Sequence, residues 1–173
     1  MKNVLLVVLF MIGVVGYSVG KNVRLHGSLK EFGTNVVSMD FDGAAGEISK
    51  EWSQKIMVNK DGSFDFSFDL KKPGYYSVGR NTLYLTPGDD MEVYLGTSQP
   101  QSWFKGKGAD VNNYMKGRLF PKAGSFLEAG RNVKGSFEET KKYIDERAAQ
   151  REKELKALPN ASKEFVELEM MRI

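Results

Sequence analysis

Residues 63–70 read Ser-Phe-Asp-Phe-Ser-Phe-Asp-Leu, and this stretch decides the fold. In an extended chain, one face carries the large apolar side chains Phe64, Phe66, Phe68 and Leu70. Such strict alternation predicts an antiparallel strand with one buried face and one solvated face. Burial of each of these side chains contributes roughly 1.5–3 kcal/mol before entropy is subtracted. We therefore expect this strand to anchor the core.

Short candidate strands separated by turns surround this stretch. They are residues 23–29, 35–41, 52–58, 75–78, 82–85 and 91–95. Asp61-Gly62 and Pro87-Gly88 mark two of the turns, because glycine readily supplies the positive φ that tight turns need. Short strands at a spacing of roughly 8–12 residues are typical of a sandwich or barrel. The sequence therefore predicts a mainly β (α+β) chain, with an antiparallel β-sandwich, or a partly open barrel, at residues 21–106.

A helical segment is predicted at residues 107–173. The first helix, residues 109–120, places Val111, Tyr114, Met115 and Leu119 on one side. The second begins at the capping box that Ser136 and Glu139 form, and runs to about Leu158. Its thin apolar stripe consists of Phe137, Ile144, Ala148, Leu155 and Leu158.

A third helix begins near residues 160–162 and carries Phe165, Val166, Met170 and Ile173. No C-capping residue follows it, so we expect the chain to be a fragment of a longer protein. The apolar stripes are too thin for an independent bundle, so these side chains should pack against the sandwich, the second helix or a missing domain. We expect the missing domain to matter, and the third helix to be poorly ordered without it.

The first twenty residues have the pattern of a secretory signal peptide. Lys2 supplies a positive start, Val4–Val15 is an almost unbroken apolar run, and small residues precede Lys21. An apolar run of about a dozen residues is short for a bilayer core of ~30 Å. We therefore predict a signal peptide at residues 1–20 and export to the periplasm or cell envelope, with no membrane attachment after cleavage. The alternative is a retained membrane anchor.

Composition excludes several classes of activity. The chain has no cysteine, which rules out disulfides, thiol chemistry and lipid attachment through cysteine. A formal net charge of +3 gives no indication of nucleic-acid binding. The single histidine, His26, falls on the polar face of a strand without a nucleophile motif. We therefore expect this chain to have no catalytic residues, cofactor or metal.

Three acidic or glycine-rich patterns are weak candidates for sites. Asp40, Asp42 and Glu51 have the spacing of three calcium-loop ligands, but alanines occupy the positions where a ligand and a glycine belong. Asp65 and Asp69 lie ~13 Å apart along one strand, too far for paired acid–base work. The sequence at 106–108, Gly-Lys-Gly, is interpreted as a flexible joint before a helix rather than a phosphate-binding loop.

A basic segment is the remaining candidate surface. Residues 105–134 contain seven basic side chains and two acidic ones, in either a solvated connector, which we favour, or a surface that faces an anion or partner. The weak candidate binding residues are Lys105, Lys107, Lys116, Arg118, Trp52 and Trp103. Exposed aromatic side chains such as Trp52, Trp103 and Tyr76 would stack on sugars, although core packing is their commoner role.

The order of short motifs resembles a known domain. The motifs are Leu25-His26-Gly27, Asp61-Gly62-Ser63-Phe64-Asp65-Phe66, Pro73-Gly74-Tyr75-Tyr76, Leu83-Tyr84-Leu85-Thr86-Pro87-Gly88-Asp89 and the run from Phe104 to Tyr114. Together they resemble the N-terminal domain of unknown function of TlpA-like thiol:disulfide interchange proteins, thioredoxin-related envelope proteins of Gram-negative anaerobes. The resemblance covers residues 21–114, and the helices after it are similar to that family's variable spacer.

The resemblance implies a non-catalytic accessory module. In the family, a thioredoxin-fold domain with a Cys-x-x-Cys pair follows the spacer, so the expected partners are that covalently following domain and an envelope client protein. The module would position either of them. The alternative is a free-standing envelope protein that binds a glycan or an anionic surface component. A hydrolase is a distant third possibility.

Overall fold

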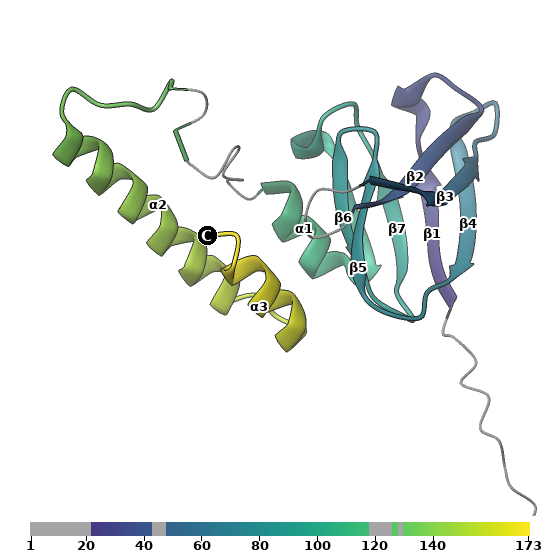
Figure 1. The fold of residues 1–173 in the computed structure, drawn as a ribbon. Coiled ribbons are helices and arrows are strands. Elements are labelled where there is room, and N and C mark those ends of the chain that lie inside the picture. The colour runs from purple at the N-terminus through teal and green to yellow at the C-terminus, as the bar shows by residue number, and fades with distance from the viewer. Residues whose placement is uncertain (1–21, 43–47, 118–125, 128–129) are drawn as a thin grey trace, which may run out of the picture.

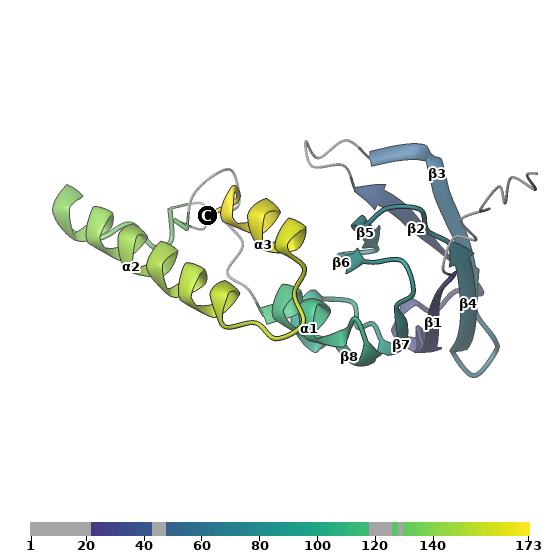
Figure 2. The ribbon, with the colours of Figure 1, turned by 90° about the horizontal axis from the view of Figure 1, so that it is seen from below.

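The computed structural model describes residues 22–42, 48–117, 126–127 and 130–173, and for residues 22 and 48–52 it describes the backbone alone. Eight strands form two four-stranded sheets, which face each other as two layers (Figures 1 and 2). The strands are β1 Asn22–Ser28, β2 Val36–Asp42, β3 Ile48–Met57, β4 Ser63–Asp69, β5 Gly74–Val78, β6 Asn81–Leu85, β7 Asp90–Tyr94 and β8 Trp103–Lys107. Short 3-10 helices lie at Lys30–Phe32 and Gln99–Gln101. The predicted mainly β sandwich is confirmed.

The first sheet has the strand order β4-β1-β7-β8, and the second has the order β3-β2-β5-β6. The two sheets are separate, so the barrel alternative is wrong. Every pairing among the described strands is antiparallel except one: β1 runs parallel to β7, with Arg24 opposite Asp90 and Ser28 opposite Tyr94. The prediction of a purely antiparallel sandwich missed this pair, because alternation within a strand carries no information about its neighbour's direction.

The core lies between the two sheets and is apolar. Its most deeply buried members are Val23, Leu25 and Leu29 near β1, Met39 and Ile56 in β2 and β3, Val78, Leu83 and Leu85 in β5 and β6, and Met91 and Val93 in β7. Successive residues of a strand point to opposite faces, which explains why every second residue enters this core.

The burial of strand β4 is less complete than the sequence pattern predicts. It forms an edge of the first sheet, so it has a neighbour on one side only. Phe64 and Leu70 are buried as expected, but Phe66 and Phe68 are partly exposed and pack at the margin of the core. The alternation correctly identified the inward face, but the buried centre of this sheet is formed by β1 and β7 instead.

Helix α1, Ala109–Gly117, joins the edges of both sheets through two consecutive asparagines. Asn112 Oδ1 accepts a hydrogen bond from the Tyr84 amide of β6 at 2.9 Å, and Asn112 Nδ2 donates one to the Tyr84 carbonyl at 2.9 Å. Asn113 makes the same pair of bonds with Phe104 of β8, at 3.3 and 2.8 Å. Each side-chain amide thus pairs with an edge strand as a neighbouring peptide group would.

Helices α2, Phe137–Lys156, and α3, Lys163–Met170, complete the described chain. The predicted capping box is present: Ser136 Oγ accepts from the Glu139 amide, and the Glu139 carboxylate accepts from the Ser136 amide. The predicted stripe of α2 is partly wrong, since Phe137 is 76% exposed and Arg151 is buried beside Leu155. Among the helices in the described part of the chain, none is long and apolar enough to cross a membrane.

Helix α3 packs against the outer face of the second sheet. Tyr75 of β5 and Tyr84 of β6 are opposite each other in the sheet and point away from the sandwich core. Phe165 is fully buried against them, with its ring centroid 4.7 Å from that of Tyr84. The terminal helix is therefore docked on the sandwich and on α2, the first two of the three expected alternatives.

Candidate functional site

A buried polar network joins the sandwich to the helices. Glu169 of α3 is fully buried, and its Oε1 accepts a hydrogen bond from the Tyr75 hydroxyl at 2.8 Å. Its Oε2 lies 3.4 Å from Nη2 of Arg151, a buried residue of α2. The Arg151 guanidinium also lies 4.8 Å from the centre of the Tyr114 ring of α1. One ion pair therefore contacts elements from the sandwich and from all three helices.

The aromatic rings of Tyr75, Tyr84, Tyr114 and Phe165 surround this network. We call these rings together with Arg151 and Glu169 the junction. The rings of Tyr75 and Tyr84 meet edge to face at 5.0 Å, and Tyr114 meets Phe165 in the same manner at 6.1 Å. On the exposed side, the Arg172 guanidinium covers the Tyr75 ring at 4.1 Å. Such contacts each add to the area that is buried, and they fix the orientation of the rings.

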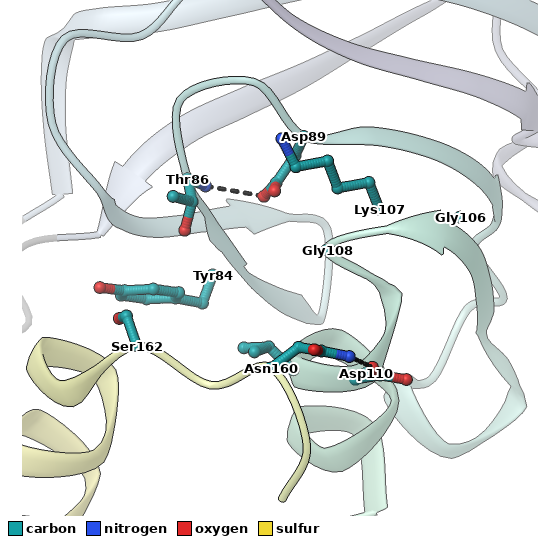
Figure 3. Close-up of a pocket in the computed structure, with 10 residues that line it drawn as sticks. Tyr84, Thr86, Asp89, Gly106, Lys107, Gly108, Asp110, Asn160 and Ser162 are labelled. Atoms are coloured by element: carbon teal, nitrogen blue, oxygen red, sulfur yellow. Dashed lines mark hydrogen bonds between the residues drawn. The ribbon is translucent and has the colours of Figure 1, made fainter.

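A cavity of about 310 Å³ lies beside the junction (Figure 3). It is lined by Tyr84, Thr86, Asp89, Gly106, Lys107, Gly108, Asp110, Val111, Asn160 and Ser162. These residues come from the sandwich, from α1 and from the loop between α2 and α3. The loop is held to α1 by the amide of Asn160, which donates to Asp110 Oδ2 at 2.7 Å.

Asp89 is the buried charge of this cavity. Its Oδ2 accepts a hydrogen bond from the Thr86 amide at 2.7 Å and so closes the predicted turn. Burial raises the pKa of this carboxyl, while the Thr86 hydrogen bond and the Lys107 charge act in the opposite direction. The carboxylate offers a hydrogen-bond acceptor in the cavity, but the turn already accounts for its position.

The glycines at 106 and 108 have a structural explanation. Both have a positive φ, +97° and +98° respectively. A Cβ on Gly106 would lie 2.5 Å from the Asp90 carbonyl, and one on Gly108 would lie 2.6 Å from the Asp89 carboxyl carbon. The two glycines therefore let the chain pass close to β7 as it enters α1, which agrees with the interpretation of this sequence as a joint.

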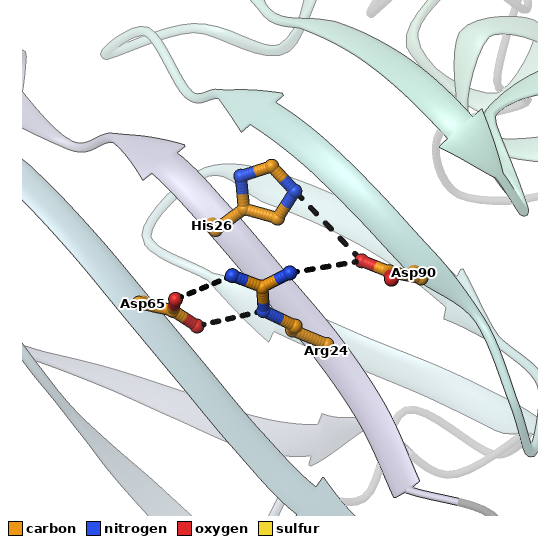
Figure 4. Close-up of polar contacts among 4 residues, drawn as sticks. All are labelled: Arg24, His26, Asp65 and Asp90. Atoms are coloured by element: carbon orange, nitrogen blue, oxygen red, sulfur yellow. Dashed lines mark hydrogen bonds and ion pairs between the residues drawn. The ribbon is translucent and has the colours of Figure 1, made fainter.

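A charged cluster occupies the solvent face of the first sheet (Figure 4). Arg24 donates two hydrogen bonds to Asp65, from Nε at 3.1 Å and from Nη2 at 2.6 Å. These bonds hold the pKa of the Asp65 carboxyl below its usual value. His26 lies on the same face, with Nε2 3.7 Å from Asp90 Oδ1. The predicted polar orientation of His26 is thus observed.

The predicted basic residues do not gather on one surface. Lys107 lines the cavity beside the junction, whereas the Lys116 ammonium donates to the Ser102 carbonyl at 2.8 Å. Lys105 is 70% exposed and lies over the Trp103 ring at 4.7 Å. Arg118 lies outside the described residues. The three described lysines therefore occupy three different environments.

Of the predicted aromatic residues, Trp103 alone is placed on a described outer surface. Its ring stacks on that of Tyr94 in the adjacent strand, with centroids 6.0 Å apart and planes 9° apart. Tyr76 is only 7% exposed and belongs to the sandwich core, so its proposed exposure is wrong. Trp52 lies in β3, but its side chain is outside the described part of the structure.

The sequence pattern gave no role to Arg151 and Glu169, the buried ion pair of the junction, or to Asn112 of α1. The helical spacing could have identified the pair, because each charged residue lies on the same helix face as a buried apolar residue. Arg151 is four residues before Leu155, and Glu169 is four residues after Phe165. Within the described residues, no group of three or more acidic or histidine side chains is arranged to hold a metal. The calcium-loop pattern lies partly outside those residues.

No protein-family model, curated protein or solved structure matches this chain.

Proposed function

We propose that this chain is a non-catalytic accessory module of an exported TlpA-like thiol:disulfide oxidoreductase, and that it positions a following thioredoxin-fold domain or that domain's client. The junction carries this proposal. A helix can set the orientation of a following domain only if its own position is fixed. Helix α3 is fixed to the second sheet by the buried Phe165 and by the Tyr75–Glu169 hydrogen bond at 2.8 Å.

The ordered turn motifs support the same assignment. Pro73-Gly74-Tyr75-Tyr76 contributes the tyrosine that binds Glu169, and Val111-Asn112-Asn113-Tyr114 contributes the asparagines that join both sheets. These motifs therefore coincide with the contacts that hold the helices on the sandwich. A module that positions another domain would need these contacts, which gives a physical reason for the presence of the motifs.

The first test is the reading frame downstream of Ile173. We expect it to encode a Trp-Cys-x-x-Cys motif in a βαβ context within ~100 residues. An immediate stop codon would count heavily against the proposal.

The second test measures how rigidly α3 is held. The chain has no native cysteine, so Ser67→Cys and Met171→Cys place two spin labels at exposed positions on the first sheet and beyond α3. Pulsed electron spin resonance should give a narrow distance distribution, which Glu169→Gln should broaden. The matched control Asp145→Asn removes an exposed charge of α2 and should leave the distribution unchanged. A broad distribution in the parent protein would contradict a positioning role.

A second candidate function, glycan binding in the envelope, rests on the Tyr94–Trp103 pair. The two stacked rings and the Lys105 ammonium lie on the outer face of the first sheet. Aromatic faces of this kind pack on sugar rings, and lysine donates to sugar hydroxyls or to carboxylates. Tryptophan fluorescence should change on titration with cell-wall fragments in the parent and in Trp52→Phe, but not in Trp103→Phe. A flat response of the parent across the panel would remove this function.

A further inference from the structure

A second pocket lies between the two sheets at the end of the sandwich opposite the Asn59–Gly62 turn. Its volume is about 510 Å³, within the range of about 300–1,000 Å³ that small-molecule pockets occupy. It is lined by Phe41, Gln54, Phe68, Asp69, Leu70, Lys71, Lys72 and Tyr76. The pocket shares no lining residue with the junction, so a ligand bound there is independent of the proposed function.

Three aromatic rings form the apolar wall of this pocket and hold one another in place. Tyr76 of the second sheet meets Phe41 edge to face at 5.6 Å and Phe68 of the first sheet at 5.8 Å. Gly74 leaves room for this arrangement, because a Cβ there would lie 2.9 Å from Cε2 of Phe41. The wall is therefore already assembled without a ligand.

The mouth of the pocket is formed by the link between β4 and β5. Lys71 and Lys72 are both exposed on this link, where the chain crosses from the first sheet to the second. Asp69 is the one acidic residue among the described lining residues, so the charged side chains of those lining residues have a net charge of +1. The pocket thus combines an apolar interior with a cationic rim.

We propose that this pocket binds a single-chain amphiphile with an anionic headgroup, of the fatty carboxylate class. The hydrocarbon chain would lie against Phe41, Phe68 and Tyr76, where its burial supplies the affinity. The headgroup would lie at the rim beside Lys71 and Lys72, which bind it electrostatically. Among the described lining residues, a fully polar ligand finds the side chains of Gln54 and Asp69 and the Tyr76 hydroxyl besides the lysines. A neutral hydrocarbon makes no use of the rim.

The test is isothermal titration calorimetry of the purified protein with dodecanoate below its micelle concentration. We expect saturable binding of one equivalent, weaker binding of 1-dodecanol, and none of butyrate. Phe68→Ala should weaken dodecanoate binding about tenfold, the factor that corresponds to 1.4 kcal/mol. Phe32→Ala is the matched control, because Phe32 is also a partly buried aromatic residue at the margin of the core but does not line the pocket, and the affinity of this variant for dodecanoate should stay within about twofold of the parent.

Surface variants keep the test independent of folding. Lys71→Glu/Lys72→Glu should weaken dodecanoate binding about fivefold at low salt and leave 1-dodecanol binding unchanged. Lys30→Glu/Lys60→Glu reverses two exposed lysines near the opposite end of the sandwich and should change neither. Absence of saturable dodecanoate binding, or equal losses in the Phe32 and Phe68 variants, would overturn the proposal. Equal affinity for the alcohol and the carboxylate would overturn the anionic headgroup.

Discussion

The sandwich core and the junction bury side chains of opposite character. The core between the sheets is apolar, with Leu25, Met39 and Leu83 exposed by 2% or less. The junction buries Arg151 and Glu169 to a similar degree, at 2% and 0%. An apolar core tolerates many arrangements of similar volume, whereas a buried ion pair is satisfied in one geometry.

The two regions therefore make different contributions: the core supplies stability, and the junction specifies the orientation of the helices. Leu25 and its neighbours supply the free energy that folds the sandwich. The ion pair at the junction gains little net free energy, because the cost of removing both charges from water offsets their attraction. We infer that its main effect is to specify how α2 and α3 lie on the second sheet.

Glu169→Gln is expected to have the largest effect and to test this comparison directly. It leaves the Arg151 charge buried opposite a neutral amide, so we expect a loss of about 3–5 kcal/mol in the free energy of unfolding. Urea unfolding followed by circular dichroism measures this loss. Arg151→Met/Glu169→Leu should recover most of the stability. The exposed-pair control Asp145→Asn should change it by about 0.5 kcal/mol or less. A double variant as unstable as Glu169→Gln would break the comparison.

Leu25→Ala addresses the apolar side of the comparison. Leu25 is 2% exposed in a central strand, and truncation of such a side chain costs about 2–5 kcal/mol. Met57→Ala, at a position that is 65% exposed, should stay within about 0.5 kcal/mol of the parent protein. The variant that combines Leu25→Ala with Glu169→Gln tests whether the core and the junction unfold together. We expect a single unfolding transition, and two separate transitions would show that the regions unfold independently.

Asn112→Ala has an intermediate effect at the boundary between the regions. Loss of the amide leaves the Tyr84 backbone groups without their side-chain partner, at a cost of about 1–3 kcal/mol. Hydrogen exchange should accelerate at the Tyr84 amide in this variant and at the Phe104 amide in the matched control Asn113→Ala. The same exchange pattern in both variants would show that α1 acts through packing alone.

Asp89→Asn is expected to have the smallest effect, of about 1 kcal/mol or less at pH 7, because the amide oxygen can still accept the Thr86 hydrogen bond and no charge is buried. Burial raises the pKa of the Asp89 carboxyl above its usual value. The folded state therefore binds the proton more tightly than the unfolded state, so the parent gains stability relative to the variant as the pH falls through the raised pKa. Asp65→Asn should show the opposite trend, because the Asp65 pKa is lowered and its contribution is lost on acidification. Thermal unfolding from about pH 7 to about pH 3 checks both signs.

The strands were predictable because their burial follows from local pattern. The alternation at 63–70 located β4, and the Asp61-Gly62 turn located its start. Strand β8, Trp103–Lys107, was missed because two lysines and Gly106 conceal its alternation. The edge position of β4 and the parallel β1–β7 pair could not be predicted, since both depend on neighbours that are distant in sequence.

The candidate site was less predictable than the fold. Sequence composition identified Trp103 and Lys105 separately, and the structure brings them together. The buried pair of Arg151 and Glu169 could not be distinguished from solvated charges, because charged residues on helices are nearly always exposed. Their burial depends on the outward tyrosines Tyr75 and Tyr84, whose orientation the sequence pattern does not reveal.

The parallel pairing of β1 with β7 also determines how late in synthesis β1 can obtain both of its partner strands. β1 occupies the interior of the first sheet, so it needs a partner on each side, and its second partner begins only at Asp90. A ribosome adds roughly 5–20 residues per second, so the first strand waits several seconds with one edge unpaired. Pairings between such distant segments also slow the subsequent folding. The nascent chain therefore passes through a period in which a chaperone can still hold it unfolded.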